Sequence, residues 1–256
     1  MVWLLDLDGV LWRGDEAIPG SADAVARIRA VGIGVAFLTN NSSQPVGVYE
    51  AKLERMGVPV APGEVLTSAM AAVSLLQPGE TALVCGGPGV DEAISARGVH
   101  GVRTLAGARS SGRAVDAVVV GWHRDFDYDR LDAAFQAVIA GARLIGTNDD
   151  ATYPMAGGHL LPGGGSLLAA VAYASGATPI VAGKPHDATV ALVHERLGAI
   201  DVMVGDRPDT DGLLARRLGA RFVQVRSGVT PSGDPSEADA DVIADDLASA
   251  VSAILT

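Results

Sequence analysis

Cysteine, lysine and aromatic residues are scarce in this chain of 256 residues. Cys85 is the single cysteine, so no disulfide can form within the chain, which is typical of a reducing compartment. Cys85 has no activating neighbour in the sequence, and we expect a buried core residue. Aromatic residues make up 4 % of the chain, which leaves a core built mainly from Ala, Val and Leu.

The sequence also lacks an excess of positive charge and any long hydrophobic run. The formal net charge is −11, which argues against nucleic acid as a partner because such proteins need a basic face. No uninterrupted apolar run approaches the roughly 18 residues of a membrane span. Asp6 and Asp8 interrupt the apolar N-terminal stretch, which argues against a secretory signal there. We therefore expect a cytoplasmic protein without nucleic-acid or membrane partners.

Short apolar runs recur along the chain and alternate with segments of helical periodicity. Most runs are continuously apolar, as in parallel strands that are covered on both faces. The expected strands are Val2–Leu7, Ile33–Leu38, Ala82–Cys85, Ala117–Val120, Arg143–Ile145, Ile180–Ala182, Val202–Val204, Arg221–Val225 and Val242–Ala244. The expected helices span 21–32, 127–142, 166–176, 187–198 and 209–219. This alternation predicts an α/β protein with a twisted parallel sheet.

Polar residues follow four of the expected strands at the point where each strand ends. Ligands of open parallel sheets bind at the carboxyl ends of the strands, so these residues are candidates for one site. They are Asp6 and Asp8 at the end of the first run, Thr39 and Asn40 after the second, Lys184 after Ile180–Ala182, and Asp206 after Val202–Val204.

The aspartates are of a type and spacing that favour a metal site. Asp6 and Asp8 flank Leu7, so on a regular strand both carboxylates point to the same face, where their charges repel unless a cation or proton lies between them. Asp206 adds a third carboxylate. Three such oxygens around an open position suit Mg²⁺, which keeps several waters and shares a substrate phosphate. Any one of these aspartates alone is equally well explained as a turn or helix-cap residue.

Thr39, Asn40 and Lys184 can donate hydrogen bonds to an anion. Lys184 is one of only two lysines in the chain, so its position after an expected strand favours a functional role. Taken singly, Thr39 and Asn40 also suit a turn that caps a helix, and Lys184 suits the surface.

Taken together, four segments in this order resemble the motifs of the haloacid dehalogenase superfamily of phosphohydrolases: DLDGVLW, LTNNS, GKP and GDRPDTD. The segments GTNDDATYP and PGGGS are similar to those of class IIA, which contains p-nitrophenylphosphatases, phosphoglycolate phosphatases, glycerol-phosphate phosphatases and pyridoxal phosphatase. The resemblance implies a Rossmann-like parallel-sheet core, residues 1–79 and 180–256, with helices on both faces. It also implies an inserted α/β cap domain, residues 80–179.

The same resemblance implies a Mg²⁺-dependent phosphatase for small-molecule phosphate monoesters. Asp6 would be the nucleophile that forms an aspartyl-phosphate. Asp8 would protonate the leaving alcohol and later deprotonate water. Mg²⁺ would be bound by Asp6, the backbone carbonyl of Asp8 and Asp206, and Asp211 would support these ligands without binding the metal itself.

Further roles implied by the resemblance concern the phosphoryl group. Thr39, Asn40 and Lys184 would bind its oxygens, with Lys184 also assisting catalysis. Gly9 would let the chain turn close to the phosphate.

The expected cap would supply the contacts to the leaving group and allow a homodimer. Its candidate substrate residues are Asn148, Asp149, Tyr153 and His159. Two positions depart from the family pattern. His123, in GWHRDFDY, replaces an acid that such caps often carry, and Tyr153 lies where some relatives have a histidine that recognises the substrate.

Two other functions stay open on the same fold. One is a phosphate-ester binding module without turnover, against which the intact set of Asp6, Asp8, Lys184 and Asp206 argues. The other is a phosphotransferase that passes the phosphoryl group to an alcohol other than water. A nucleotide-binding domain is disfavoured because the glycines of CGGPGVDE, residues 85–92, do not fit the dinucleotide fingerprint.

Overall fold

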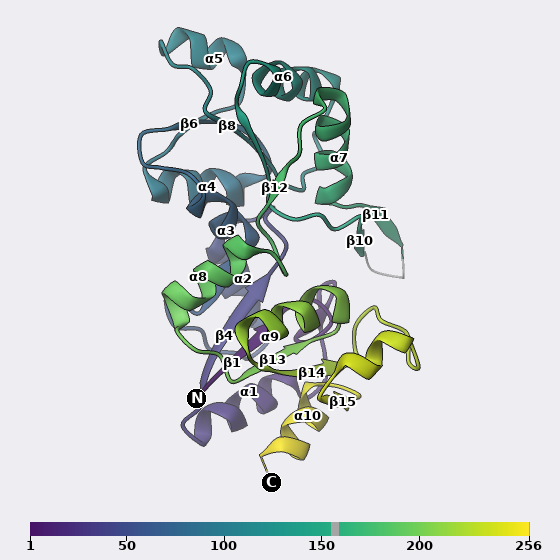
Figure 1. Cartoon of the computed structure of the whole chain (residues 1–256). Helices are drawn as coiled ribbons and strands as arrows, with labels where there is room; N and C mark the ends of the chain where they lie inside the picture. Colours follow the sequence, from purple (N-terminus) through teal and green to yellow (C-terminus); the bar gives the residue numbers. More distant parts are fainter. Residues whose placement is uncertain (155–158, 256) are drawn as a thin grey trace. The chain divides into compact units, whose positions relative to one another are not determined.

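The computed structural model describes residues 1–154 and 159–255 and contains two compact units (Figure 1). Unit 1 comprises Met1–Thr39, Gly47–Leu66 and Val190–Thr256. Unit 2 comprises Asn40–Val46 and Thr67–Thr189. The interval expected for the cap, 80–179, lies within unit 2, which also takes in 67–79 and 180–189. The domain limits expected from the sequence stay a prediction.

Unit 1 is built on a sheet with the strand order β15–β14–β13–β1–β4–β5. Its central strand β1 pairs in parallel with β4 on one side and with β13 on the other. The chain thus leaves β1 in one direction and later returns on its opposite side, which puts a topological switch point at the carboxyl end of β1. The strands are β1 (Val2–Asp6), β4 (Gly34–Thr39), β5 (Val65–Thr67), β13 (Val202–Gly205), β14 (Arg221–Val225) and β15 (Val242–Ala244).

Helices cover both faces of this sheet. Helices α1 (Ser21–Ala30) and α10 (Leu247–Ile254) pack against each other on one face, and α9 (Leu213–Leu218) lies on the other (Figure 1). The remaining elements of unit 1 are the hairpin strands β2 (Trp12–Arg13) and β3 (Glu16–Ala17), helix α2 (Val46–Arg55), a π-helical turn (Pro208–Gly212) and a 3-10 turn (Pro235–Asp239).

Unit 2 has its own parallel sheet, with the order β12–β9–β8–β6–β7. The elements are β6 (Thr81–Cys85), β7 (His100–Val102), β8 (Ala117–Val120), β9 (Arg143–Gly146), β12 (Ile180–Val181), the hairpin β10 (Thr152–Pro154) and β11 (Leu160–Pro162), and helices α3 (Ser68–Ser74), α4 (Pro88–Arg97), α5 (Leu105–Ser110), α6 (Tyr128–Ile139) and α7 (Gly164–Ser175). Helix α8 (Asp187–Leu197) begins in unit 2 and ends in unit 1.

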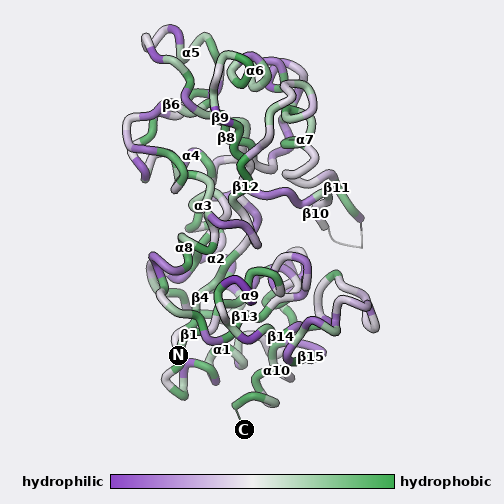
Figure 2. The backbone as a smooth tube through the Cα atoms, viewed as in Figure 1, coloured by the Kyte–Doolittle hydropathy of each residue, from purple (hydrophilic) through white to green (hydrophobic). Residues whose placement is uncertain are grey.

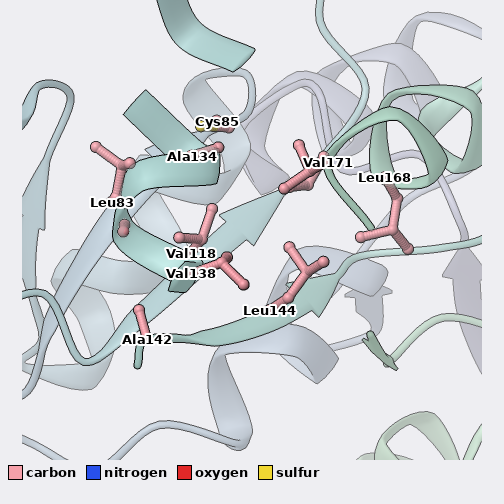
Figure 3. Packing of buried hydrophobic residues seen from close by; sticks show 11 residues of the cluster. Leu83, Cys85, Val118, Ala134, Val138, Ala142, Leu144, Leu168 and Val171 are labelled. Carbon is pink, nitrogen blue, oxygen red and sulfur yellow. The ribbon is translucent and has the colours of Figure 1, made fainter. Parts of the chain in front are cut away.

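The core of unit 2 shows why its strands lack alternation of polar and apolar residues. Leu83 and Val118 point from the sheet toward α6 and α7, where they meet Val138, Leu168 and other apolar side chains (Figure 3). Intervening strand residues such as Val84 face the opposite side, where α4 packs. Both faces are therefore buried, as the continuous apolar runs predict.

Cys85 belongs to this core, as expected. Its side chain is buried, and burial raises the pKa of the thiol to about 11. The thiol therefore stays protonated and unreactive at neutral pH.

The α/β fold class and all nine expected strands are confirmed. The five expected helices are also present, although the last begins as the π-helical turn before α9. Several strand ends differ from the expectation by one residue, and β1 ends at Asp6 rather than at Leu7 because residues 7–12 fold into a tight turn. Within the described part of the chain, no helix is long and apolar enough to cross a membrane.

Candidate functional site

The strand register of unit 1 brings three expected site residues to one edge of its sheet. Asp6 is opposite Leu38 of β4, so Thr39 follows one residue beyond it. Leu5 is opposite Val204 of β13, which places Asp206 just past the carboxyl end of that strand. This is the edge at which the switch point lies, so the polar ends meet where parallel sheets bind ligands.

Three buried carboxylates gather at this edge. One oxygen from each of Asp6, Asp206 and Asp211 lies within 4.8 Å of the others. The three residues are 8 %, 3 % and 0 % exposed, so water screens their charges poorly. Like charges this close require a cation or protons between them. An all-oxygen, anionic donor set of this kind fits a hard divalent cation such as Mg²⁺ or Ca²⁺.

Backbone groups orient two of these carboxylates. Oδ2 of Asp206 accepts a hydrogen bond from the backbone N–H of Val229 at 2.7 Å. Oδ2 of Asp211 accepts one from the N–H of Arg207 at 3.1 Å. Asp211, expected to stand behind the metal ligands, thus places an oxygen beside those of the other two aspartates.

Glycines make room for the carboxylates. A Cβ atom on Gly228 would lie 1.9 Å from Oδ2 of Asp206, and one on Gly205 would lie 2.3 Å from Cγ of Asp211. Gly9 has a φ of +81° and would place a Cβ 2.8 Å from the Asp206 carboxylate. Only glycine fits at these positions without displacing a carboxylate.

Asp8 lies in the turn that follows β1. The carbonyl of Leu7 accepts hydrogen bonds from the N–H groups of Val10, Leu11 and Trp12, which folds the chain back on itself. Oδ1 of Asp8 accepts a hydrogen bond from Nε1 of Trp12 at 2.9 Å. The expected metal contact of Asp8 involves its backbone carbonyl and stays a prediction.

In unit 2, the side chain of Asn40 holds the backbone at Lys184. Oδ1 of Asn40 accepts a hydrogen bond from the N–H of Lys184 at 2.7 Å, and Nδ2 donates to the Lys184 carbonyl at 3.2 Å. Lys184 is only 2 % exposed, and a buried ammonium group requires polar or anionic partners. Nδ2 of Asn40 is also 3.2 Å from Oδ2 of Asp150.

Two of the expected substrate residues adjoin this arrangement. Nδ2 of Asn148 donates to the carbonyl of Asn40 at 2.7 Å. Oδ2 of Asp149 lies 3.0 Å from Nε2 of His186, two residues after Lys184. The hydrophilic stretch that contains both residues leads into β10 (Figure 2).

Tyr153 lies on the β10–β11 hairpin. Its hydroxyl accepts a hydrogen bond from Nδ2 of Asn41 at 3.1 Å, and its ring stacks on Trp122 with 4.5 Å between centroids. Nε1 of Trp122 donates to the carbonyl of Pro162, which ties the ring to the second hairpin strand. His159 is exposed, and in the described ranges no hydrogen bond or ion pair links it to the other expected substrate residues.

His123 lies in a buried setting of unit 2. Its Nδ1 is 2.9 Å from the carbonyl of Gly121, and its ring meets that of Phe126 edge-on. Burial lowers the pKa of His123, an effect that the hydrogen bond to Gly121 and the charge of Asp125 oppose.

The expected site residues are therefore divided between the units. Asp6, Asp8, Gly9, Thr39, Asp206 and Asp211 belong to unit 1, whereas Asn40 and Lys184 belong to unit 2. That Lys184 meets the aspartates at a single cleft stays a prediction.

Sequence reasoning overlooked residues that shape this site. Gly228 and Val229 follow β14, so the rule that strand ends carry ligand-binding groups could have indicated them. Trp12 stands within the first motif, yet its apolar neighbours made it resemble a core residue. Asn41 lies in the LTNNS motif, but its contact with Tyr153 and that of Trp122 with Tyr153 could not be predicted, because both join residues far apart in the chain.

Models of known families match both ends of the chain. The model described as haloacid dehalogenase-like hydrolase matches residues 3–100, and a second model of HAD-like hydrolases matches residues 181–250. Glycerol-3-phosphate phosphatase of Gallus gallus is 36 % identical over 248 residues, covering 89 % of this chain and 80 % of that protein. Acid sugar phosphatase of Staphylococcus saprophyticus is 33 % identical over 237 residues, covering 89 % of this chain and 87 % of that protein.

A solved structure supports the same relationship. Glycerol phosphate phosphatase from Mycobacterium tuberculosis, in complex with magnesium, superposes with a TM-score of 0.83 at 31 % identity, covering 97 % of this chain and 75 % of that chain. The same protein has also been solved with calcium. With these matches and the carboxylate edge of its parallel sheet, the chain belongs to the haloacid dehalogenase-like hydrolases, as its four sequence motifs predict.

Proposed function

We propose that this protein is a divalent-cation-dependent phosphatase that hydrolyses small-molecule phosphate monoesters. The observation that carries the proposal is the buried group of Asp6, Asp206 and Asp211 at the switch point of the sheet. Such a group of like charges favours a cation or protons between its members and is suited to hold a cation against a phosphate. Relatives named for glycerol 3-phosphate and for acid sugar phosphates support substrates of this size and class.

Asp6 is the nucleophile. Its carboxylate attacks phosphorus, the bond to the alcohol oxygen breaks, and an aspartyl-phosphate forms. Water then attacks the same phosphorus, which releases inorganic phosphate and restores Asp6. Asp8 gives a proton to the leaving oxygen in the first step and accepts one from water in the second.

Asp6, Asp206 and the backbone carbonyl of Asp8 would hold the cation, for which we propose Mg²⁺, and Asp211 stabilises this arrangement. When bound, the cation neutralises charge on the carboxylates and on the phosphoryl oxygens. The buried donor set of oxygens fits such an ion, and the hydrogen bonds from Val229 and Arg207 keep two carboxylates aimed at the site.

Thr39, Asn40 and Lys184 bind the phosphoryl oxygens, and Gly9 leaves room beside them. The side chain of Asn40 fixes the backbone of Lys184, so the two act as one unit. Because phosphoryl transfer depends mainly on positioning and charge neutralisation, this rigidity contributes directly to rate.

Residues 80–179 act as the cap domain of the enzyme, and residues 1–79 and 180–256 form its core domain. In the cap, Asn148, Asp149, Tyr153 and His159 contact the alcohol part of the substrate. Tyr153 is held by Asn41 and Trp122, which suits a residue that selects among leaving groups. We further propose a cytoplasmic enzyme that dimerises through the cap.

A phosphate-release assay with and without Mg²⁺, over a panel of phosphorylated metabolites and p-nitrophenyl phosphate, tests the function. We expect Asp6→Asn to lower kcat by more than about 1,000-fold, as removal of a nucleophile does in other hydrolases. The same change at Asp23, which is exposed on α1, is the matched control. Wild-type rates in Asp6→Asn would overturn the proposal. Release of phosphate and alcohol in equal amounts would exclude transfer to another acceptor.

A further inference from the structure

Trp12 holds the carboxylate of Asp8 by a direct hydrogen bond. Its indole Nε1 donates to Oδ1 of Asp8 at 2.9 Å. Trp12 is 1 % exposed, so water competes little for this bond. The tight turn at residues 7–12 creates the contact, because the N–H of Gly9 donates to the carbonyl of Trp12 at 2.7 Å and brings the ring back over Asp8.

Lys52 of α2 holds the same ring from its face. The ammonium nitrogen lies 4.2 Å from the centroid of the Trp12 ring, at cation–π distance. Lys52 also donates to the carbonyl of Gly14 at 2.6 Å and lies 3.8 Å from Asp15, at the tip of the β2–β3 hairpin. Burial lowers the pKa of Lys52, and the charges of Asp8 and Asp15 oppose this lowering. The indole is thus fixed at its face and at its N–H.

We propose that Trp12 is a positioning residue for the proton transfers of Asp8, an inference that rests on the proposed function. An indole N–H donates but cannot accept, so Oδ1 of Asp8 serves as an acceptor in both protonation states. The transferable proton therefore resides on Oδ2.

This assignment keeps the two half-reactions balanced. In the first, the Asp6–phosphorus bond forms while the bond between phosphorus and the leaving oxygen breaks, and the Oδ2–H bond of Asp8 breaks as its proton goes to that oxygen. In the second, Oδ2 accepts a proton from water, while the new oxygen–phosphorus bond forms and the Asp6–phosphorus bond breaks. Trp12 itself exchanges no proton.

A comparison of leaving groups tests this role. An alkoxide is a poor leaving group and needs protonation as it departs, whereas p-nitrophenolate leaves well without it. The quantity to measure is kcat/KM for p-nitrophenyl phosphate and for the alkyl phosphate that the wild type hydrolyses fastest. Trp12→Phe should lower kcat/KM for the alkyl phosphate about tenfold or more, which is part of the rate enhancement that a general acid typically contributes. The loss for p-nitrophenyl phosphate should stay below about threefold, since its first step depends little on Asp8.

Trp3→Phe is the matched control. Trp3 is 0 % exposed, and within the described residues its Nε1 has no hydrogen-bond partner. Trp3→Phe removes an indole N–H that orients no carboxylate. The ratio of kcat/KM for the alkyl phosphate to kcat/KM for p-nitrophenyl phosphate should therefore not change.

Equal losses of kcat/KM on both substrates in a folded Trp12→Phe protein would overturn the positioning role, and so would no loss. If Trp12→Phe does not fold, site-specific replacement of Trp12 by benzothienylalanine keeps the ring shape and removes only the N–H. This replacement should again lower kcat/KM more for the alkyl phosphate than for p-nitrophenyl phosphate. A wild type without Mg²⁺-dependent phosphatase activity would instead contradict the proposed function.

Discussion

His123 is a buried residue of unit 2, and its burial lowers the stability of the folded protein at low pH. The folded protein holds this imidazole neutral, because burial lowers its pKa below the ordinary value of 6.5. Asp125 faces the ring and favours its charged form, whereas Arg130 and Arg103 oppose that form. The unfolded chain therefore binds more protons than the folded protein once the pH falls below 6.5, and stability decreases as the pH decreases.

Urea unfolding at a series of pH values checks this linkage. As the pH falls below 6.5, the free energy of unfolding should decrease less in His123→Asn than in the wild type, because the variant lacks the titrating group. The same change at the exposed His194 is the control. An identical pH dependence in the wild type and His123→Asn would contradict the prediction.

For single residues, the sequence predicted which side chains belong to the site better than it predicted their neighbours in space. Asp6 and Asp206 could be predicted because each lies at or just beyond a strand end and has the side chain that the chemistry needs, whereas Asp211, in the π-helical turn, followed only from the resemblance of GDRPDTD to a family motif. The role of Gly228 could not be predicted, since it depends on a distance through space to a residue 22 positions earlier.

The segment after β14 orients Asp206 and contacts the turn that follows β1. It contributes the N–H of Val229 to the carboxylate, and Ser227 donates its hydroxyl to the carbonyl of Gly9 at 2.6 Å. The loop thereby joins β14 to the turn that carries Asp8, across more than 200 residues of sequence. Carboxylates this well oriented lose little freedom when a cation binds.

Gly228→Ala should weaken cation binding. The new methyl group would overlap Asp206 and Gly228 cannot retreat without breaking the contact of Val229, so we expect Mg²⁺ affinity to fall by about 10- to 100-fold. The Mg²⁺ concentration at half-maximal activity measures this. Gly47→Ala, at a helical position with open space around its Cβ, should leave that concentration unchanged. An unaltered Mg²⁺ requirement in Gly228→Ala would show that Asp206 tolerates displacement.

Elements were predictable from the sequence where their patterns were long or strongly apolar. The nine expected strands are present, whereas α2, α3, α4, α5 and α10 were not predicted. Helix α4 begins at Pro88, inside the glycine-rich stretch 85–92 that lacks the dinucleotide fingerprint, because proline is favourable in the first turn of a helix. Helix α3 has only seven residues, too few to show periodicity.

On the scale of the whole molecule, the charge distribution couples metal binding to stability. The chain has a formal net charge of −11, and three of its carboxylates are buried side by side. Without a cation, folding must tolerate their repulsion or bind protons to relieve it. A cation that binds only the folded protein stabilises it according to its saturation.

Mg²⁺ should therefore raise the midpoint of thermal unfolding, and a chelator should reverse the change. At 100 times the dissociation constant, the expected stabilisation is about 2.7 kcal/mol. Differential scanning fluorimetry over a Mg²⁺ titration measures it. In Asp206→Asn the response should be lost, and without added metal this variant should be at least as stable as the wild type. A wild type whose unfolding is indifferent to Mg²⁺ and Ca²⁺ would exclude the site.

The two-unit organisation was only partly predictable. An insertion of about 100 residues could be inferred from the spacing of the motifs. Its limits could not, because continuously apolar parallel strands look alike in both sheets. Ile180–Val181, expected as a strand of the core, pairs with β9 in the sheet of unit 2.

The hydrogen bonds between the Asn40 side chain and the Lys184 backbone make the protein sensitive to deamidation during storage. Its two hydrogen bonds to one residue need an amide, which both donates and accepts. Spontaneous deamidation would leave an aspartate, which loses the donor and adds a negative charge beside Asp150 and next to Lys184, the residue proposed to bind phosphate. A stored preparation would then lose turnover through one altered amide, with the fold intact and the mass almost unchanged.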